Sequence, residues 1–283
     1  STPRAVGPIA TSTLAPTLSL SAALPEGARL VIGTADGTIR QNDAGGNVFL
    51  NSGLQGQDVA VAPDGLTLAY VRAGVLILET QSDNGRRTEV AVAGTAHAAM
   101  PSWSADGKQL SVIEHASDGD SVYSLALDSQ RLVKLLTAPQ IVAPARFNPA
   151  TDRILIAEKT GVTATAFFSI ASDCTGVENC LASRRDIASV NDDVTWADYH
   201  PNAASIVFSA QNGNLYLLLP GSGDVQPLLV DSTFKVRPTF NKDGSWLAFV
   251  DLTDRNRLMV MRFADHHVQA TPIADVLNVD WVR

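Results

Sequence analysis

Short hydrophobic runs alternate with polar positions along the whole chain and are separated by tight turns. In PSWSADGKQLSVI at 101–113, a run ends in a large apolar residue, a turn containing Asp and Gly follows, and a second apolar run begins. Alternation with a period of two residues is typical of half-buried β-strands, and an Asp-Gly turn joins two such strands in a hairpin. No segment sustains the 3.6-residue period of an amphipathic helix. The pattern predicts an all-β chain.

This hairpin phrase is an internal repeat, with a period of about 40–50 residues. Each copy places a large residue directly before the turn: Val61, Trp103, Phe147, Tyr199 and Phe240, with Trp281 in a final fragment. Two more short strands are predicted after each hairpin. In the last full repeat, the fourth strand is predicted at Thr271–Ala274. Four short antiparallel strands per repeat are typical of one blade of a β-propeller.

The two ends of the chain complement each other. Residues 29–52 supply three strands but lack the strand that opens every other repeat, and residues 276–283 supply one strand and nothing after it. Joining them makes one blade from both ends, which removes two exposed sheet edges. We therefore predict a six-bladed propeller of four-stranded blades over 28–283, with blades at about 29–53 plus 276–283, 57–93, 98–137, 141–190, 194–230 and 234–275. The alternative is an open or five-bladed array with ragged ends.

The repeat also resembles a known family. Pro101-Ser-Trp103-Ser-Ala-Asp106-Gly107-Lys108-Gln-Leu110 is similar to the repeat of TolB-type propellers, and Pro238-Thr-Phe240-Asn-Lys-Asp243-Gly244-Ser-Trp246-Leu247 is a second copy. The resemblance covers about residues 28–283 and concerns the propeller module, since the separate α/β domain of TolB is not evident in residues 1–27. Family members are mostly periplasmic or extracellular and often bind peptides or proteins. The resemblance thus implies an exported binding module.

Composition and charge narrow the classes of partner. The hydrophobic share of 45% and the charged share of 18% are those of a globular protein. The net charge is −8, and the close basic pairs are Arg86-Arg87 and Arg184-Arg185, so a nucleic acid ligand is not expected. No apolar run reaches the ~18 residues of a transmembrane helix. Residues 1–27, rich in Pro, Ser, Thr and Ala, are interpreted as a tether to a membrane anchor or signal, or alternatively as an irregular packed strap.

The two cysteines, Cys174 and Cys180, lie close together in the polar segment SDCTGVENC. A local disulfide is predicted, which fits an exported protein in an oxidising compartment. Zinc would need two more ligands, and no histidine lies nearby in the sequence. A redox pair would more usually be spaced Cys-x-x-Cys.

The sequence lacks the common motifs of catalytic and metal sites. The sequence has no G-x-S-x-G elbow, no H-E-x-x-H, no C-x-x-C-H and no calcium-loop pattern. No catalytic residue, metal site or cofactor is therefore predicted.

Strand alternation predicts which residues face the central channel of the propeller. If the residue before each turn packs between blades, the residues one and three positions earlier face the channel. The charged and aromatic members of these two rings are Asp58, Arg146, Trp196, Asp198, Arg237 and Asp280. They are candidates for binding a small polar ligand, an ion or a peptide end, with arginine recognising a carboxylate. The alternative is a paired or solvated network that only fills the channel.

Three functions remain open at this stage. The first is a non-catalytic scaffold in the cell envelope that binds a protein or peptide. The second is a structural subunit of a larger envelope complex. The third is a hydrolase or lyase that uses channel carboxylates such as Asp198 and Asp280 as an acid and base pair.

Overall fold

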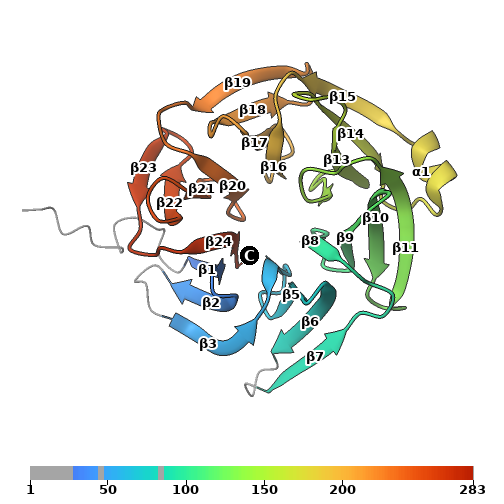
Figure 1. The fold of residues 1–283 in the computed structure, drawn as a ribbon, viewed down its shortest axis with the longest axis horizontal. Coiled ribbons are helices and arrows are strands. Elements are labelled where there is room, and N and C mark those ends of the chain that lie inside the picture. The colour runs from blue at the N-terminus through green and yellow to red at the C-terminus, as the bar shows by residue number, and fades with distance from the viewer. Residues whose placement is uncertain (1–27, 44–47, 82–85, 283) are drawn as a thin grey trace, which may run out of the picture.

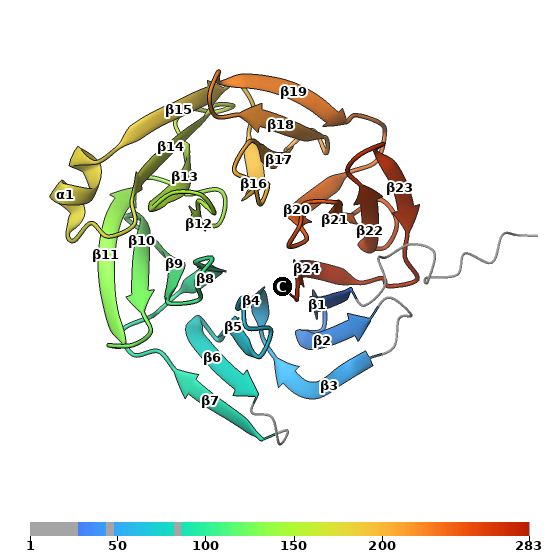
Figure 2. The same ribbon diagram turned by 180° about the vertical axis from the view of Figure 1, so that it is seen from behind.

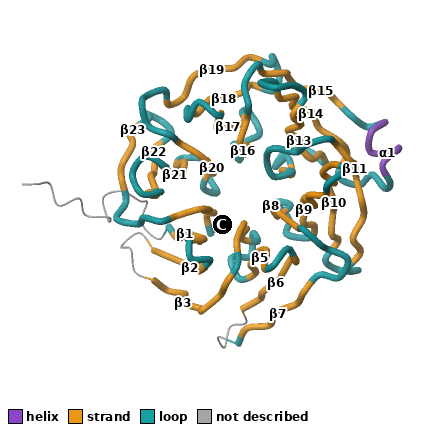
Figure 3. The backbone as a smooth tube through the Cα atoms, in the orientation of Figure 1, coloured by secondary structure: helices purple, strands orange, loops and turns teal. Residues whose placement is uncertain are grey.

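The computed structural model describes residues 28–43, 48–81 and 86–282. Six four-stranded antiparallel sheets stand around a central axis like the blades of a propeller (Figures 1 and 2). Strand predominates throughout (Figure 3), and within the described residues the one α-helix is α1, Val177–Ala182, at the outer edge of the ring. The tether predicted for residues 1–27 lies outside the described residues.

Each blade runs from an inner strand near the axis to an outer strand at the rim. Blades two to four are β4 to β7 (Gln57–Val61, Thr67–Arg72, Val75–Gln81, Arg87–Ala91), β8 to β11 (Ala98–Trp103, Gln109–Ala116, Gly119–Ala126, Arg131–Ala138) and β12 to β15 (Arg146–Phe147, Arg153–Lys159, Thr165–Ala171, Arg185–Val190). Blades five and six are β16 to β19 (Val194–Tyr199, Ile206–Ala210, Leu215–Leu219, Asp224–Leu229) and β20 to β23 (Lys235–Phe240, Trp246–Asp251, Arg257–Arg262, His267–Ala270).

The first blade is built from both ends of the chain. Its inner strand is β24 (Val276–Trp281), followed outward by β1 (Arg29–Thr34), β2 (Thr38–Asp43) and β3 (Val48–Gln55). β24 pairs antiparallel with β1 from Leu30↔Trp281 to Thr34↔Val276. The predicted closure and the six-blade count are therefore confirmed, and the open or five-bladed alternative is wrong.

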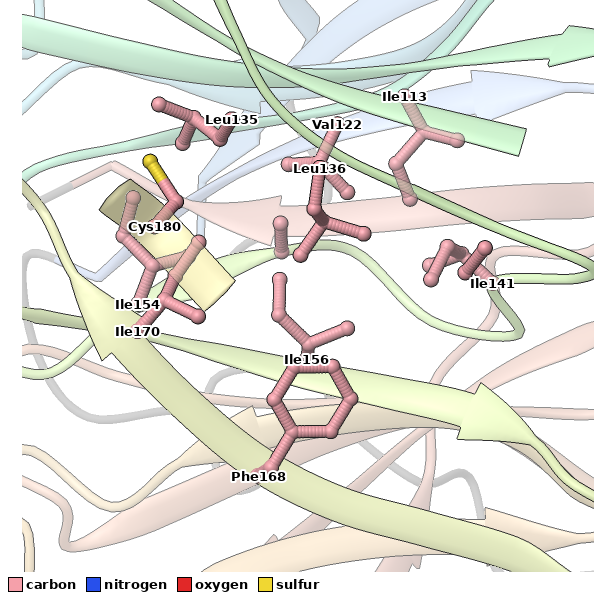
Figure 4. Close-up of a cluster of buried hydrophobic side chains, with 12 residues drawn as sticks. Ile113, Val122, Leu135, Leu136, Ile141, Ile154, Ile156, Phe168, Ile170 and Cys180 are labelled. Atoms are coloured by element: carbon pink, nitrogen blue, oxygen red, sulfur yellow. The ribbon is translucent and has the colours of Figure 1, made fainter. Parts of the chain in front are cut away.

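Apolar side chains fill the space between every pair of neighbouring blades. One buried cluster lies in each of the six interfaces; the cluster between blades three and four contains Ile113, Val122, Ile154 and Phe168 (Figure 4). Trp103, which precedes its turn, and Trp281, its counterpart in the final strand, are buried there, which is the condition on which the channel assignment rests. Each indole Nε1–H donates to a carbonyl of the preceding blade: Trp103 to Ala60 (3.2 Å) and Trp281 to Thr239 (3.0 Å). The repeated motif residue thus joins adjacent blades.

Blade four carries an insertion between β14 and β15, which explains its longer repeat. Cys174 and Cys180 form the predicted disulfide, with a Cα–Cα distance of 5.1 Å. Cys180, within α1, is fully buried in the apolar cluster between blades three and four (Figure 4), whereas Cys174 packs at the edge of that cluster.

Because Cys180 is buried, the stability of a variant without the disulfide should depend on which residue replaces Cys180. Replacing both should lower the free energy of unfolding by about 2 kcal/mol through loss of the cross-link. The double variant Cys174→Ser, Cys180→Ser should be less stable than Cys174→Ser, Cys180→Ala by roughly 1–3 kcal/mol in free energy of unfolding. The reason is that a serine hydroxyl at position 180 is buried in an apolar cluster. Urea unfolding of the two double variants measures the difference. Equal stabilities would contradict the buried role of Cys180.

One predicted strand was misplaced. The outer strand of blade six is His267–Ala270, paired from Met259↔Ala270 to Arg262↔His267, and not Thr271–Ala274. Thr271 instead ends the strand, because its hydroxyl donates to the carbonyl of Leu258 (2.7 Å) and its N–H bonds the same carbonyl. The segment that follows, containing Pro272, leads back to β24.

The hairpin turn of blade six needs glycine. Gly244 has φ +75°, and a Cβ there would overlap the imidazole of His200 from blade five, which packs on the rings of Phe240 and Phe263. Gly244→Ala should therefore destabilise the ring by about 1–3 kcal/mol. Gly107→Ala is the matched control, since Gly107 lies in the equivalent Asp-Gly turn of blade three with φ +71°, and a Cβ there would meet its nearest heavy atom, from Pro63, at 3.5 Å. Thermal unfolding compares the two; similar shifts would argue against the contact with His200.

Candidate functional site

The inner strands carry a bulge at the level of the predicted channel residues. Asp58, Met100 and Arg237 occupy the same repeat position and have φ values of 52°, 51° and 54°. The pairing register shifts by one residue at each of them, so regular alternation along these strands is a wrong assumption. A left-handed backbone costs roughly 1–2 kcal/mol for a non-glycine residue. The side chains of Met100 and Arg237 are thus placed here against their backbone preference.

The structure brings five of the six predicted channel residues into one connected row, which we call the belt. Arg237 Nη1 donates to Asp58 Oδ1 at 3.0 Å, and the Arg237 guanidinium lies 4.7 Å from the ring centroid of Trp196. Arg146 lies 5.6 Å from the same ring, and its Nε is 3.3 Å from Asp198 Oδ1. The belt, Asp58–Arg237–Trp196–Arg146–Asp198, links blades two, six, five and four across the channel.

The channel carboxylates also hold neighbouring blades together. Asp198 Oδ2 accepts from the Thr239 hydroxyl (3.0 Å) and from the Phe240 N–H (3.3 Å) of the next blade. Asp280 Oδ2 accepts from Val61 N–H (2.8 Å), the equivalent atom one blade further on. Both carboxylates are buried. They act as acceptors between strands, and this does not favour an acid and base pair that exchanges protons with a substrate.

Two pockets lie at opposite ends of the channel. The turn pocket has a volume of about 220 Å³. The rim consists of the first turn residue of five blades: Pro63, Ala105, Pro149, Pro201 and Lys242. The wall is aromatic and consists of Trp103, Phe147, Tyr199 and Phe240. The floor is polar and consists of Ser102, Arg146 and Asp198. Burial raises the pKa of Tyr199, so its phenol stays neutral. The rim was missed from sequence, although one turn position recurring with proline was a usable signal.

The second pocket, which we call the arginine pocket, has a volume of about 420 Å³ and lies where the inner strands begin, between blades one and two. It is lined by Gly33, Thr34, Ala35, Gly37, Gln55, Gly56, Gln57, Asp58, Val71, Arg72, Ala73, Arg237, Leu277 and Asn278. Asp36 lies in the adjoining turn, where bonds from the Thr34 hydroxyl and the Thr38 N–H hold its pKa at about 2. Asp36 is therefore ionised at neutral pH.

Between the pockets the channel narrows to a space of about 10 Å³, lined by Asp58, Val59, Met100, Pro101, Arg146, Trp196, Asn278, Val279 and Asp280. The belt thus separates the two pockets. Asp280 also lines this space, where its carboxylate accepts from the N–H groups of Val61 and Trp281. Whether any of the six residues binds a ligand stays a prediction. No group of three or more His, Cys, Asp or Glu side chains that could hold a metal occurs among the described residues.

Comparison with solved structures addresses the fold. No family model and no curated protein matches the chain. TolB from Acinetobacter baumannii superposes with a TM-score of 0.67 at 15% identity, over 90% of this chain and 66% of that one. The chain is a six-bladed β-propeller similar in structure to the TolB propeller. It thus spans slightly less than two thirds of the Acinetobacter TolB chain.

Two further structures extend the likeness of this TolB-like propeller. A protein described as TolB from Agrobacterium tumefaciens gives a TM-score of 0.63 at 13% identity, over 86% of this chain and 87% of that one. A chain of the nidogen–laminin complex gives a TM-score of 0.69 at 13% identity, over 91% and 99%. At such identities the likeness concerns the fold alone. Within the part of the chain that is described, no helix is long and apolar enough to cross a membrane.

Proposed function

We propose that this TolB-like propeller is an exported, non-catalytic scaffold that binds a protein or peptide partner in the cell envelope through its turn pocket. The observation that carries the proposal is the composition of that pocket. Proline and aromatic side chains surround a polar floor of Arg146 and Asp198, with Lys242 exposed at the rim. Aromatic residues and arginine are enriched in protein interfaces, where they act as energetic anchors.

The chemistry of the channel supports binding over catalysis. Asp198 and Asp280 are occupied by hydrogen bonds between blades, and Asp198 also pairs with Arg146. Export is supported by the disulfide, since such bonds persist in oxidising compartments. A chain of similar fold belongs to the nidogen–laminin complex, which is an example of a propeller in a protein assembly.

A photo-crosslinking experiment tests the proposed site. A benzophenone amino acid at position 242, on the rim, should form one discrete adduct in envelope extract of the source cells, and the same group at position 88, on the exposed outer strand β7, should not. Unlabelled wild-type protein should compete, whereas a Pro149→Glu, Lys242→Glu variant should not.

Other results would redirect the assignment. A stoichiometric complex that cross-links only through position 88 would favour a structural subunit that packs through its outer edge. Absence of an adduct at 242 would overturn the proposed site. Substrate turnover that is lost in Asp198→Asn would overturn the non-catalytic assignment.

A further inference from the structure

The arginine pocket exists because blades one and two carry small residues at positions where most other blades carry larger ones. At the position of Gly33, the later repeats have Val71, Ile113, Ala157, Ser209 and Val250. At the position of Ala35, blades three to six have His115, Lys159, Gln211 and Leu252, whereas blade two has Ala73. Gly37, Gly56 and Ala73 complete a wall of small residues. The hollow is thus a local departure from the repeat and not a general property of the fold.

The inner end of this pocket holds hydrogen-bond donors in excess of acceptors. A guanidinium offers donors on all three nitrogens. Among the described residues, Arg237 makes one hydrogen bond, from Nη1 to Asp58, and its side chain remains 27% exposed. Each oxygen of Asp58 already accepts one hydrogen bond, Oδ1 from Arg237 and Oδ2 from Met100 N–H at 3.3 Å. The remaining N–H groups of Arg237 are therefore available to a ligand.

The narrow part of the channel behind Arg237 shows the same imbalance. Trp196 is 4% exposed, and its Nε1–H has no hydrogen-bond partner among the described residues. Arg146 Nε is likewise buried without one, although it faces Asp198 as an ion pair. Buried donors in proteins are nearly always satisfied. Unpartnered donors thus also line the narrow space directly behind Arg237.

We propose that the arginine pocket binds the carboxylate of a small acid or of a peptide C-terminus, with the carboxylate on the guanidinium of Arg237 and the rest of the ligand over the small-residue wall toward Arg72. Planar guanidinium recognises carboxylate with two parallel hydrogen bonds. The cation–π contact with Trp196 and the bond to Asp58 hold the guanidinium of Arg237 in position before a ligand binds. A volume of about 420 Å³ accommodates a small molecule or the last residues of a peptide.

The charges around the arginine pocket favour a ligand whose carboxylate lies at the inner end of the pocket, at Arg237. Asp36 adds negative charge at the outer turn, and Arg72 is paired with Glu89 through Nη1 at 2.9 Å. A ligand whose carboxylate stayed at the rim would be repelled by this negative charge. A ligand whose carboxylate reaches Arg237 places its uncharged part beside Gly33, Gly56 and Leu277. The site is distinct from the turn pocket, so its test is independent of the proposed function.

Calorimetric titration of the full chain with three probes tests the proposal: succinate, tetra-alanine as the free acid, and tetra-alanine amide. The acid forms are expected to bind, and the amide roughly tenfold more weakly or not at all. Binding of tetra-alanine acid would identify a peptide terminus as the source, and binding of succinate alone would identify a small acid. Either outcome supports a carboxylate site. No binding of any acid at millimolar concentration, or equal binding of acid and amide, would overturn it.

Variants separate binding from folding. Arg237→Gln should weaken the acid at least tenfold, and Ala35→Phe should do the same by filling the pocket while leaving the Arg237–Asp58 pair in place. Arg262→Gln is the control, because Arg262 pairs with Asp265 outside the pocket. The indole N–H resonance of Trp196, assigned by Trp196→Phe, should shift on binding. Unchanged affinity in both Arg237→Gln and Ala35→Phe would contradict the proposed site.

Discussion

Trp281→Ala is expected to lower the free energy of unfolding by about 3–5 kcal/mol, the range typical of a fully buried aromatic residue. Trp281 is 2% exposed, packs with Leu30, Ile32 and Val250 between blades six and one, and donates its indole N–H to Thr239. It also belongs to the strand that closes the ring. Loss of its packing therefore weakens the only blade that unites the two chain ends, and urea unfolding followed by circular dichroism measures the effect.

Leu277→Ala is the matched control for this prediction. Leu277 lies on the same strand but is 43% exposed at the arginine pocket. Its replacement should cost much less than that of Trp281, within about 1 kcal/mol. If both variants lost the same stability, the packing of Trp281 would not be what distinguishes the closing strand.

Asp198→Leu should cost about 3–5 kcal/mol, because removal of one partner leaves the buried Arg146 charge uncompensated. The change also removes the acceptor of the Thr239 hydroxyl and the Phe240 N–H. Asp198→Asn keeps an amide oxygen for those two donors and should be milder. Arg146→Met combined with Asp198→Leu should recover part of the loss, since the double variant buries no unpaired charge.

A double-mutant cycle on this pair gives the interaction energy. The expected coupling is about 1–3 kcal/mol, as for contacting residues in one network. Additive effects of the two substitutions, or a double variant less stable than Asp198→Leu, would contradict a direct buried pair between Arg146 and Asp198.

The fold could be predicted because its signal is local and repeated. Each Asp-Gly or Asn-Pro turn specifies a hairpin, and the aromatic residue before it, as at Trp103 and Phe240, marks the interface between blades. The closure followed from an excess strand at one end and a missing strand at the other. Both inferences depend on the number and order of the predicted strands, so they hold even where a strand boundary is wrong by a few residues. The outer strand of blade six was displaced for this reason, because its exposed edge has a weak alternation pattern.

The site was less predictable because it depends on departures from the repeat. Bulges at Asp58, Met100 and Arg237 leave no common residue type in the sequence, yet they set where these side chains point. The belt could be anticipated as a set of channel residues, but its pairing required the ring geometry that brings Asp58 and Arg237 together from distant repeats. The arginine pocket arises from missing side chains at Gly33 and Ala35, which a search for reactive residues does not detect.

Native-state hydrogen exchange of the β24 amides tests the closure most directly, since protection reports the opening of each backbone hydrogen bond. Amides of Val276–Trp281 that bond to neighbouring strands should exchange only with global unfolding, at the same opening free energy as the inner hairpin of blade three, Ala98–Ala116. Exchange of the β24 amides at the rate of an exposed coil, while blade three stays protected, would show that the last strand does not close the ring.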